Sequence, residues 1–249
     1  MRLENKVAII MGGSRGIGRA IAMDCAREGA KVAVVCKHKS HSDEVVALIG
    51  REGGEAISLE ADVACEADVA KMVAQTKDKF QRIDILVNTA AVNLPYRTVA
   101  QLTLEEWDFV FRVNLTGTFL CCRAVLPEMM GQRSGKIINF SSVGGRQGCA
   151  GRAPYCPSKA AVISFTECLA AEVKEFGIDV NTICPGCVDT DMVRELCGGK
   201  APPFAMQPKE ISAVVMFLVS DEGKSITGTA INAYGLDNPI FRSISGVKK

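Results

Sequence analysis

Strand-like apolar runs alternate along the whole sequence with stretches whose apolar residues recur at helical spacing. The runs that predict strands cover residues 6–11, 31–36, 56–60, 83–88, 135–140, 178–184 and 229–233. The stretches that predict helices cover residues 16–28, 42–52, 66–80, 104–112, 115–131, 156–176 and 208–220. Such alternation is typical of a parallel sheet with helices on both faces, wound in two directions by right-handed crossovers. The sequence therefore predicts a doubly wound α/β fold, and we expect one domain over residues 1–249.

The first predicted strand runs directly into a glycine-rich turn. Gly12, Gly16 and Gly18 follow the mostly apolar run 6–11, and a helical pattern begins after them. Glycines let the backbone approach a phosphate closely, and the N-terminus of the next helix offers free N–H groups. A glycine turn placed between a strand and a helix therefore predicts a dinucleotide-binding site.

Tyr155 and Lys159 are four residues apart, and Ser142 lies thirteen residues before Tyr155. Four residues make about one helical turn, so the phenol and the ammonium share a face. A fixed cation lowers the pKa of a phenol, which is normally about 10, and such a tyrosine can exchange a proton with a carbonyl oxygen. The same spacing also occurs at ordinary amphipathic helix starts. The two histidines, His38 and His41, share one polar loop, which disfavours a histidine-based mechanism.

These motifs, in this order, resemble the short-chain dehydrogenase/reductase family in its main, 3-oxoacyl reductase-like branch. The resemblance covers nearly the whole chain and implies the strand order 3-2-1-4-5-6-7. It implies four catalytic residues: Asn114, Ser142, Tyr155 and Lys159. With the glycine turn, it implies contacts with a nicotinamide dinucleotide from Gly12, Ser14, Arg15, Gly16, Ile17, Gly18, Lys37, His38, Asp62, Val63, Asn88, Ala90, Tyr155, Lys159, Pro185, Gly186, Val188 and Thr190.

The chain departs from the family pattern at several places near the cofactor turn and the C-terminus. Met11 stands where the family usually has Thr, Ala91 stands where it has Gly, and Tyr234 and Leu236 replace an Asp and a Gly. None of these residues belongs to the catalytic set. Met11 and Ala91 are the two that could change the affinity for the cofactor or the order of its binding.

The end of the second predicted strand indicates which cofactor is used. An NAD enzyme would place an acid there for the ribose hydroxyls, but this chain has Cys36 followed by Lys37 and His38. Arg15 lies inside the glycine turn, so two cations are placed to meet a 2′-phosphate, which a carboxylate would repel. We therefore expect NADP(H), with NAD(H) as the alternative if these are ordinary solvated charges.

The resemblance and the residue chemistry together give a hydride-transfer mechanism between nicotinamide and a carbonyl or alcohol carbon. Ser142 would hold the substrate oxygen, Tyr155 would exchange the proton, and Lys159 would lower the pKa of Tyr155 and hold the nicotinamide ribose. Asn114 would hold a water that links Lys159 to solvent, or satisfy a helix kink.

A short segment, residues 191–208, corresponds to the family's substrate lid. The substrate pocket is expected to be lined by Ser142, Tyr155, Gln147, Cys149, Cys187, Met192 and Phe204, with Leu94 and Val143 nearby. These walls would be apolar, so we expect a hydrophobic or cyclic ketone. An acyl-chain keto acid, a steroid-like ring and a small cyclic ketone all stay open.

Composition excludes several other classes of protein. The net charge of +1 gives no basis for a nucleic-acid partner, and no uninterrupted apolar run reaches the roughly 18 residues of a membrane span. The first residues enter a strand directly, so we expect a cytoplasmic protein. Eleven cysteines without a secretory signal predict reduced thiols. Cys184 and Cys187 are better explained by a turn than by a redox or metal site, and we expect no metal.

The stretches 115–131 and 160–173 are apolar on more than one helical face, which predicts an exposed apolar surface and hence a homo-oligomer. Two different two-fold contacts, which the family resemblance implies, would give a tetramer, with a dimer as the fallback. Two other functions stay open: a catalytically silent cofactor-binding regulator, and an NAD-dependent alcohol dehydrogenase of the same fold. A dehydratase or epimerase would need a longer substrate domain.

Overall fold

Seven parallel strands form one sheet in the computed structural model, which describes residues 1–236. The strands are β1 (Val7–Met11), β2 (Lys31–Cys36), β3 (Ala56–Glu60), β4 (Ile85–Asn88), β5 (Gly135–Phe140), β6 (Ile178–Pro185) and β7 (Ala230–Ala233). Their order is β3-β2-β1-β4-β5-β6-β7, and every neighbouring pair is parallel. The predicted fold class and strand order are therefore confirmed. The order reverses between β1 and β4, where such sheets bind ligands.

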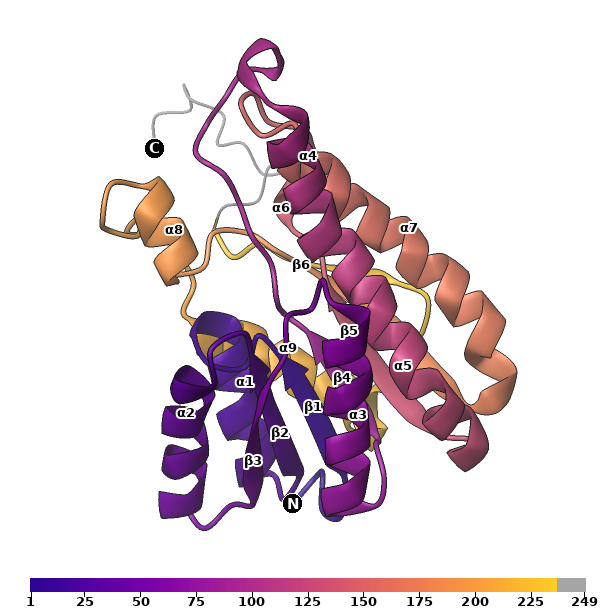
Figure 1. Ribbon diagram of the computed structural model, residues 1–249. Coiled ribbons are helices and arrows are strands. Elements are labelled where there is room, and N and C mark those ends of the chain that lie inside the picture. The colour runs from indigo at the N-terminus through magenta and orange to yellow at the C-terminus, as the bar shows by residue number, and fades with distance from the viewer. Residues whose placement is uncertain (237–249) are drawn as a thin grey trace, which may run out of the picture.

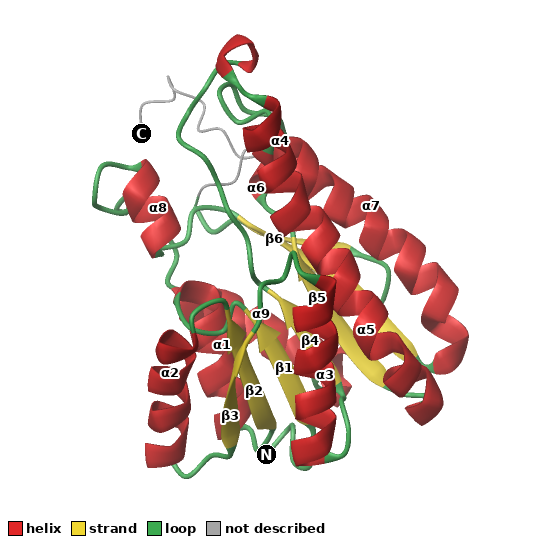
Figure 2. Cartoon of the chain, viewed as in Figure 1, coloured by secondary structure: helices red, strands yellow, loops and turns green. Residues whose placement is uncertain are grey.

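Helices cover both faces of this sheet (Figures 1 and 2). They are α1 (Gly16–Arg27), α2 (Lys39–Arg51), α3 (Glu66–Phe80), α4 (Leu104–Phe111), α5 (Gly117–Gln132), α6 (Val143–Arg146), α7 (Tyr155–Val173), α8 (Asp191–Leu196) and α9 (Pro208–Val219). Short 3-10 turns lie at Val99–Gln101, Lys174–Phe176 and Asp221–Gly223. Helix α1 packs between α2 and α9 on one face, and α5 packs between α3 and α7 on the other.

The alternation of side chains along β1 explains why both faces are covered. Ala8 and Ile10 belong to the core beneath α1, α2 and α9, while Ile9 and Met11 belong to the core beneath α3, α5 and α7. All five residues of β1 are buried. Successive residues of a strand point to opposite faces, so a continuous apolar run requires helices on both sides.

The helices predicted at 104–112 and 115–131 form one continuous helix. A stretch of π-helix, Arg112–Thr116, joins α4 to α5. In the described part of the chain, Leu104–Gln132 is the helix that by length and composition could reach across a bilayer, with a mean hydropathy of 1.4 in its most apolar window. Half of that window is buried, and α5 packs on α3, α7, β4 and β5. Its apolar character therefore matches a helix of the α/β core.

The segment 191–208 begins with the short helix α8, which stands apart from the helical layers in Figure 1. Gly198 and Gly199, at φ of 75° and 103°, follow this helix, and such backbone angles end a right-handed helix. The segment returns to the sheet beside Val188, which forms a parallel bridge with Met206. It is therefore tied at both ends to the strand edge that carries the site.

A buried polar network crosses the sheet beneath that edge. Asn88 donates to Asn139 Oδ1 (2.9 Å), Asn139 donates to Thr166 Oγ1 (2.9 Å), and Thr182 donates to the same hydroxyl (2.5 Å). These residues come from β4, β5, α7 and β6, so the network holds α7 in register with three strands. Buried polar groups are stabilising only while each has a partner.

We expect Thr166→Val to lower the free energy of unfolding by about 1–3 kcal/mol, because it leaves the Asn139 amide without its acceptor. Thr76→Val is the matched control. Thr76 is equally buried, but its hydroxyl only donates to the Met72 carbonyl within its own helix. Urea unfolding at one fixed protein concentration measures both changes. Equal losses in the two variants would contradict a stabilising role for the network.

Candidate active site

The glycine turn packs too closely on its surroundings for any side chain at two of its positions. A Cβ on Gly12, which has φ of 80°, would lie 2.8 Å from the amide nitrogen of Ala90. A Cβ on Gly18 would lie 2.2 Å from the carbonyl oxygen of Gly12. Helix α1 starts within this turn, and no side chain caps its N-terminus. The turn therefore offers free backbone N–H groups and a positive helix end to a phosphate.

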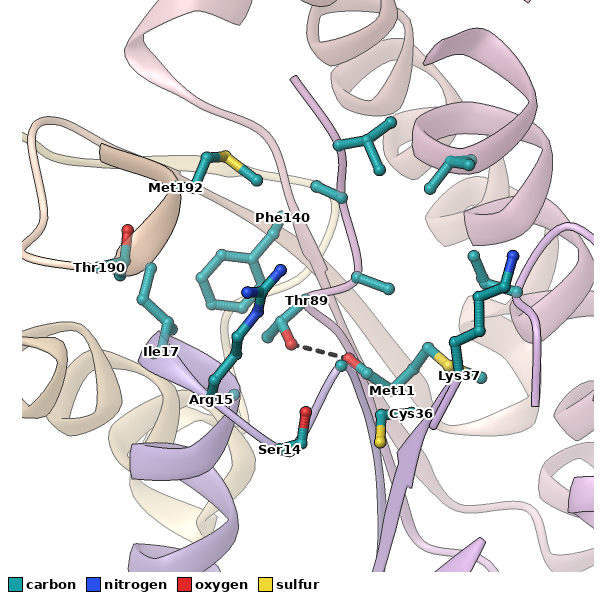
Figure 3. Close-up of a pocket in the computed structure, with 18 of the residues that line it drawn as sticks. Met11, Ser14, Arg15, Ile17, Cys36, Lys37, Thr89, Phe140, Thr190 and Met192 are labelled. Atoms are coloured by element: carbon teal, nitrogen blue, oxygen red, sulfur yellow. Dashed lines mark hydrogen bonds between the residues drawn. The ribbon is translucent and has the colours of Figure 1, made fainter. Parts of the chain in front are cut away.

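Thr89, at the end of β4, stabilises the turn from the neighbouring strand. Its hydroxyl donates to the Met11 carbonyl (2.7 Å), as the dashed line in Figure 3 shows, and its backbone N–H donates to the same oxygen (3.0 Å). The hydroxyl also lies beside Gly12 and Gly18. Thr89, directly after the adjacent strand, thus supplies a hydroxyl that Met11 lacks.

Two cations extend into the cleft from its floor (Figure 3). Arg15 follows β1 and lies 3.8 Å from Asp191 of α8, and Lys37 follows β2 and lies 2.8 Å from Asp62. Both side chains are mostly exposed, at 69% and 65%. The hydrogen bond from Lys37, followed by one from the Ala64 backbone, holds the pKa of Asp62 below its usual value. Ion pairs this exposed contribute little, so both cations can exchange partners at small cost.

A cleft of about 870 Å³ runs from these cations to Tyr155 and Lys159. Every residue predicted to bind the dinucleotide lines it, except Asn88, which is buried beneath in the polar network. Sequence reasoning missed several lining residues: His41, Ala64, Cys65, Val92, Phe109, Arg112, Val113 and Phe140. They end or follow strands or lie on α2, α4 and the π-helical stretch, where no motif marks them. The size, the glycine turn and the cations of this cleft all fit a dinucleotide.

Tyr155 is the first residue of α7, and its side chain lines the cleft beside Ser142. Burial raises the pKa of Tyr155, while the hydrogen bond with Ser142 and the charge of Arg152 oppose the rise. That Lys159 also lowers this pKa stays a prediction from the sequence; its ammonium and the guanidinium of Arg152 both lie 5.9 Å from the centre of the Tyr155 ring. Ser142 caps α6 by accepting from the Gly144 N–H (3.1 Å).

Ser141 has a different environment from Ser142. Its buried hydroxyl donates to the Lys159 carbonyl (2.7 Å), which anchors the first turn of α7 to the end of β5. Ser142 is therefore the hydroxyl of the pair that interacts with the Tyr155 phenol.

Lys159 is buried one turn further along α7. Its ammonium donates to the Phe140 carbonyl (2.8 Å) and lies 5.9 Å from the centre of the Tyr155 ring. Burial lowers the pKa of Lys159 to about 8, because an ammonium is poorly solvated there, and the nearby Cys184 opposes the shift.

Asn114 lies in the π-helical stretch, fully buried, and does not line the cleft. Its amide donates to the Val92 carbonyl (3.0 Å) and Ser158 Oγ (3.1 Å), and its oxygen accepts from the Val92 N–H (2.8 Å). Ser158 in turn donates to the Tyr155 carbonyl (2.7 Å). Both amide donors are used by protein atoms, so this side chain positions Tyr155 and the loop after β4. That Asn114 holds a water linking Lys159 to solvent stays a prediction.

The residues predicted for the substrate pocket are only partly brought together. Ser142, Tyr155 and Met192 line the cleft, and Asn93, Pro95, Tyr96, Met192, Glu195 and Leu196 line a smaller pocket of about 200 Å³. The other predicted pocket residues, Gln147, Cys149, Cys187, Phe204, Leu94 and Val143, are not among the residues that line either pocket. Phe204 is 46% exposed, and Val143 packs in a small core cluster instead.

Comparison with known proteins places this site in a family. The sequence matches the short chain dehydrogenase family over residues 6–200. A 3-oxoacyl-[acyl-carrier-protein] reductase of Synechocystis sp. is 40% identical over 240 residues, covering 94% of this chain and 97% of that protein. A reductase of the same name from Vibrio cholerae is 38% identical, covering 94% and 98%.

Solved structures agree with the sequence match. A short-chain type dehydrogenase/reductase from Mycobacterium marinum has a TM-score of 0.90 at 30% identity, covering 95% of this chain and 97% of that one. Levodione reductase has a TM-score of 0.89 at 32% identity, covering 93% and 96%. The chain therefore belongs to the short-chain dehydrogenase/reductase family.

Proposed function

We propose that this oxidoreductase is an NADP(H)-dependent ketone reductase whose substrate has an apolar body. Family membership supplies the reaction class, which is hydride transfer between nicotinamide and a carbonyl or secondary alcohol carbon. The observation that supports the proposal most directly is the arrangement of one cleft. Tyr155, Ser142 and the buried Lys159 lie at one end, and the glycine turn with two cations lies at the other.

The proton transfer rests on Tyr155 and Ser142. The bound nicotinamide would supply the hydride. Ser142 would donate to the substrate oxygen, and Tyr155, whose raised pKa keeps it protonated at neutral pH, would deliver the proton that completes the alcohol. Lys159 would hold the nicotinamide ribose, and its ammonium, next to the Tyr155 ring, would stabilise the phenolate left after transfer. Asn114 would hold the geometry through Ser158.

The preference for NADP(H) is supported by Arg15 and Lys37. Each has an exposed guanidinium or ammonium at the ribose end of the cleft, and Cys36 stands where an acid would repel a phosphate. Asp62 and Asp191, which now pair with these cations, support the second candidate, an NAD-dependent enzyme in which the two pairs stay intact.

The apolar character of the substrate is supported by apolar side chains in the walls of the cleft. Val92, Phe109, Val113, Met192 and Val193 are among the residues that line it. The names of the relatives describe reductases of 3-oxoacyl and levodione substrates, which supports the reductive direction.

Exposed aromatic side chains on the helices support a homo-oligomer, which we propose to be a tetramer. Phe119 of α5 is 39% exposed and meets Phe165 of α7 edge to face, with ring centres 6.2 Å apart. Phe217 of α9 is 40% exposed, on the other layer of helices. Two separate apolar surfaces fit two different two-fold contacts. A cytoplasmic location stays a prediction from the sequence.

Tyr155→Phe should lower kcat by about 10²–10⁴-fold, the usual contribution of a general acid, while NADPH binding stays nearly unchanged. Tyr234→Phe is the control, because Tyr234 lies in a small core cluster and bonds Asn232. Steady-state reduction of a ketone panel, followed at the nicotinamide absorbance, measures both. A Tyr155→Phe enzyme with near-native kcat would show that another group delivers the proton.

The enzyme should use NADPH with a higher kcat/KM than NADH. Arg15→Ala and Lys37→Ala should each reduce the ratio of kcat/KM with NADPH to kcat/KM with NADH about tenfold to hundredfold, since a charged hydrogen bond contributes roughly 1.5–3 kcal/mol. Arg19→Ala, an exposed cation on α1 outside the cleft, should leave the ratio unchanged. A wild-type preference for NADH, or a ratio insensitive to both variants, would favour the NAD-dependent alternative.

The kcat/KM for NADPH should fall as the pH rises through about 8, the pKa of Lys159. The ammonium is charged below that pH and loses its proton above it, whereas the raised pKa of Tyr155 keeps the phenol protonated in the same window. This kinetic constant reports the free enzyme. In Lys159→Arg this fall in kcat/KM with rising pH should be absent, because a guanidinium stays charged. A wild-type profile that stays flat to pH 9.5 is the contrary result.

A further inference from the structure

Arg152 lies three residues before Tyr155, in the turn that leads into α7. Its backbone forms a parallel bridge with Arg97, and the Arg97 N–H donates to the Gly151 carbonyl (3.1 Å). The loop after β4 and the turn before Tyr155 are therefore held against each other.

The guanidinium of Arg152 lies between two tyrosines. It donates to the Tyr96 hydroxyl (2.7 Å), and its central carbon lies 4.5 Å from the centre of the Tyr96 ring and 5.9 Å from that of Tyr155. Tyr155 lines the main cleft and Tyr96 lines the small pocket, and Met192 lines both. Arg152 thus contacts tyrosines from the walls of both pockets.

This cation is not balanced by an acid within residues 1–236. Its side-chain partners are the two tyrosines, whereas Arg97, across the bridge, is paired with Glu106 at 3.2 Å. Glu195 of α8 is exposed and lines the small pocket together with Tyr96, and in the described chain it forms no ion pair with Arg152. A guanidinium without a carboxylate, beside the proton donor of the reaction, is suited to bind an anionic group of a ligand.

We propose that Arg152 is a specificity-determining residue that binds a carboxylate of the substrate, so that keto acids are favoured over neutral ketones. The inference rests on the proposed ketone reductase activity. It selects the acyl-chain keto acid from the substrates left open by the apolar walls: the carbonyl meets Ser142 and Tyr155, and the carboxylate meets Arg152.

The test compares two oxo acids, acetoacetate and 4-oxopentanoate, with their neutral methyl esters. Wild-type kcat/KM should be about tenfold to hundredfold higher for at least one acid than for its ester, the range of a charged hydrogen bond. Arg152→Gln should abolish the difference mainly through KM, and Arg152→Lys should retain part of it. Arg97→Gln, whose charge is already paired, is the matched control and should leave the ratio unchanged.

A binding measurement separates this inference from the proposed function. Calorimetric titration of each acid and ester, with and without NADP⁺, should show that Arg152→Gln weakens binding of the acid at least tenfold relative to the ester. Absence of turnover for every ester and acid in the wild type would contradict the proposed function, whereas the titrations would still decide the role of Arg152. An acid-to-ester ratio that is the same in Arg152→Gln, Arg97→Gln and wild type would overturn the inference, and so would equal losses for acid and ester.

Discussion

Lys159 is buried, and its ammonium donates a 2.8 Å hydrogen bond to the carbonyl of Phe140, where β5 ends. Burying a charge is unfavourable unless it has partners, and this burial lowers the pKa of Lys159 to about 8. The partner of the ammonium is a backbone carbonyl, and the helix that carries Lys159 is itself fixed in place. Ser141 donates to the Lys159 carbonyl, and the network through Asn139 and Thr166 holds α7 on the sheet. Of the three ammonium donors, the protein uses one in the described chain, so the others are available to a ligand in the cleft that Lys159 lines.

Sequence reasoning reached the sheet, its two helical layers and the glycine turn, because periodicity and glycine spacing are local signals, and the family resemblance added other residues that line the cleft. It did not reach the join between α4 and α5, where the π-helical stretch replaces an expected break and Asn114 is enclosed by Val92 and Ser158. It also placed Phe204 in the substrate pocket, and that residue is not among those lining the main cleft or the small pocket. Pocket walls are built from loops whose course depends on tertiary contacts, such as the bridge between Arg97 and Arg152, and no periodicity records them.

The glycine turn shows how a local departure is compensated by a distant residue. Met11 supplies no hydroxyl, and its side chain instead enters the core beneath α3 and α5. Thr89, on the neighbouring strand, directs its hydroxyl to the Met11 carbonyl and fills the space against Gly12 and Gly18. The hydrogen bond that orders the turn therefore comes from β4, and the parallel pairing of β1 with β4 brings it there. The turn thus has a side-chain hydroxyl bound to its backbone although Met11 provides none.

The charges around the cleft fall into two kinds, and the difference decides what each can bind. Arg15 and Lys37 are exposed and paired with Asp191 and Asp62, so a phosphate has to compete with a carboxylate for them, although solvent makes that competition cheap. Arg152 has aromatic faces and one phenol oxygen as partners, and cation–π contacts satisfy a guanidinium only in part. A ligand carboxylate would displace no acid from Arg152, so its binding would not have to break an existing ion pair. Burial raises the pKa of Tyr155, and the same Arg152 charge partly opposes that rise.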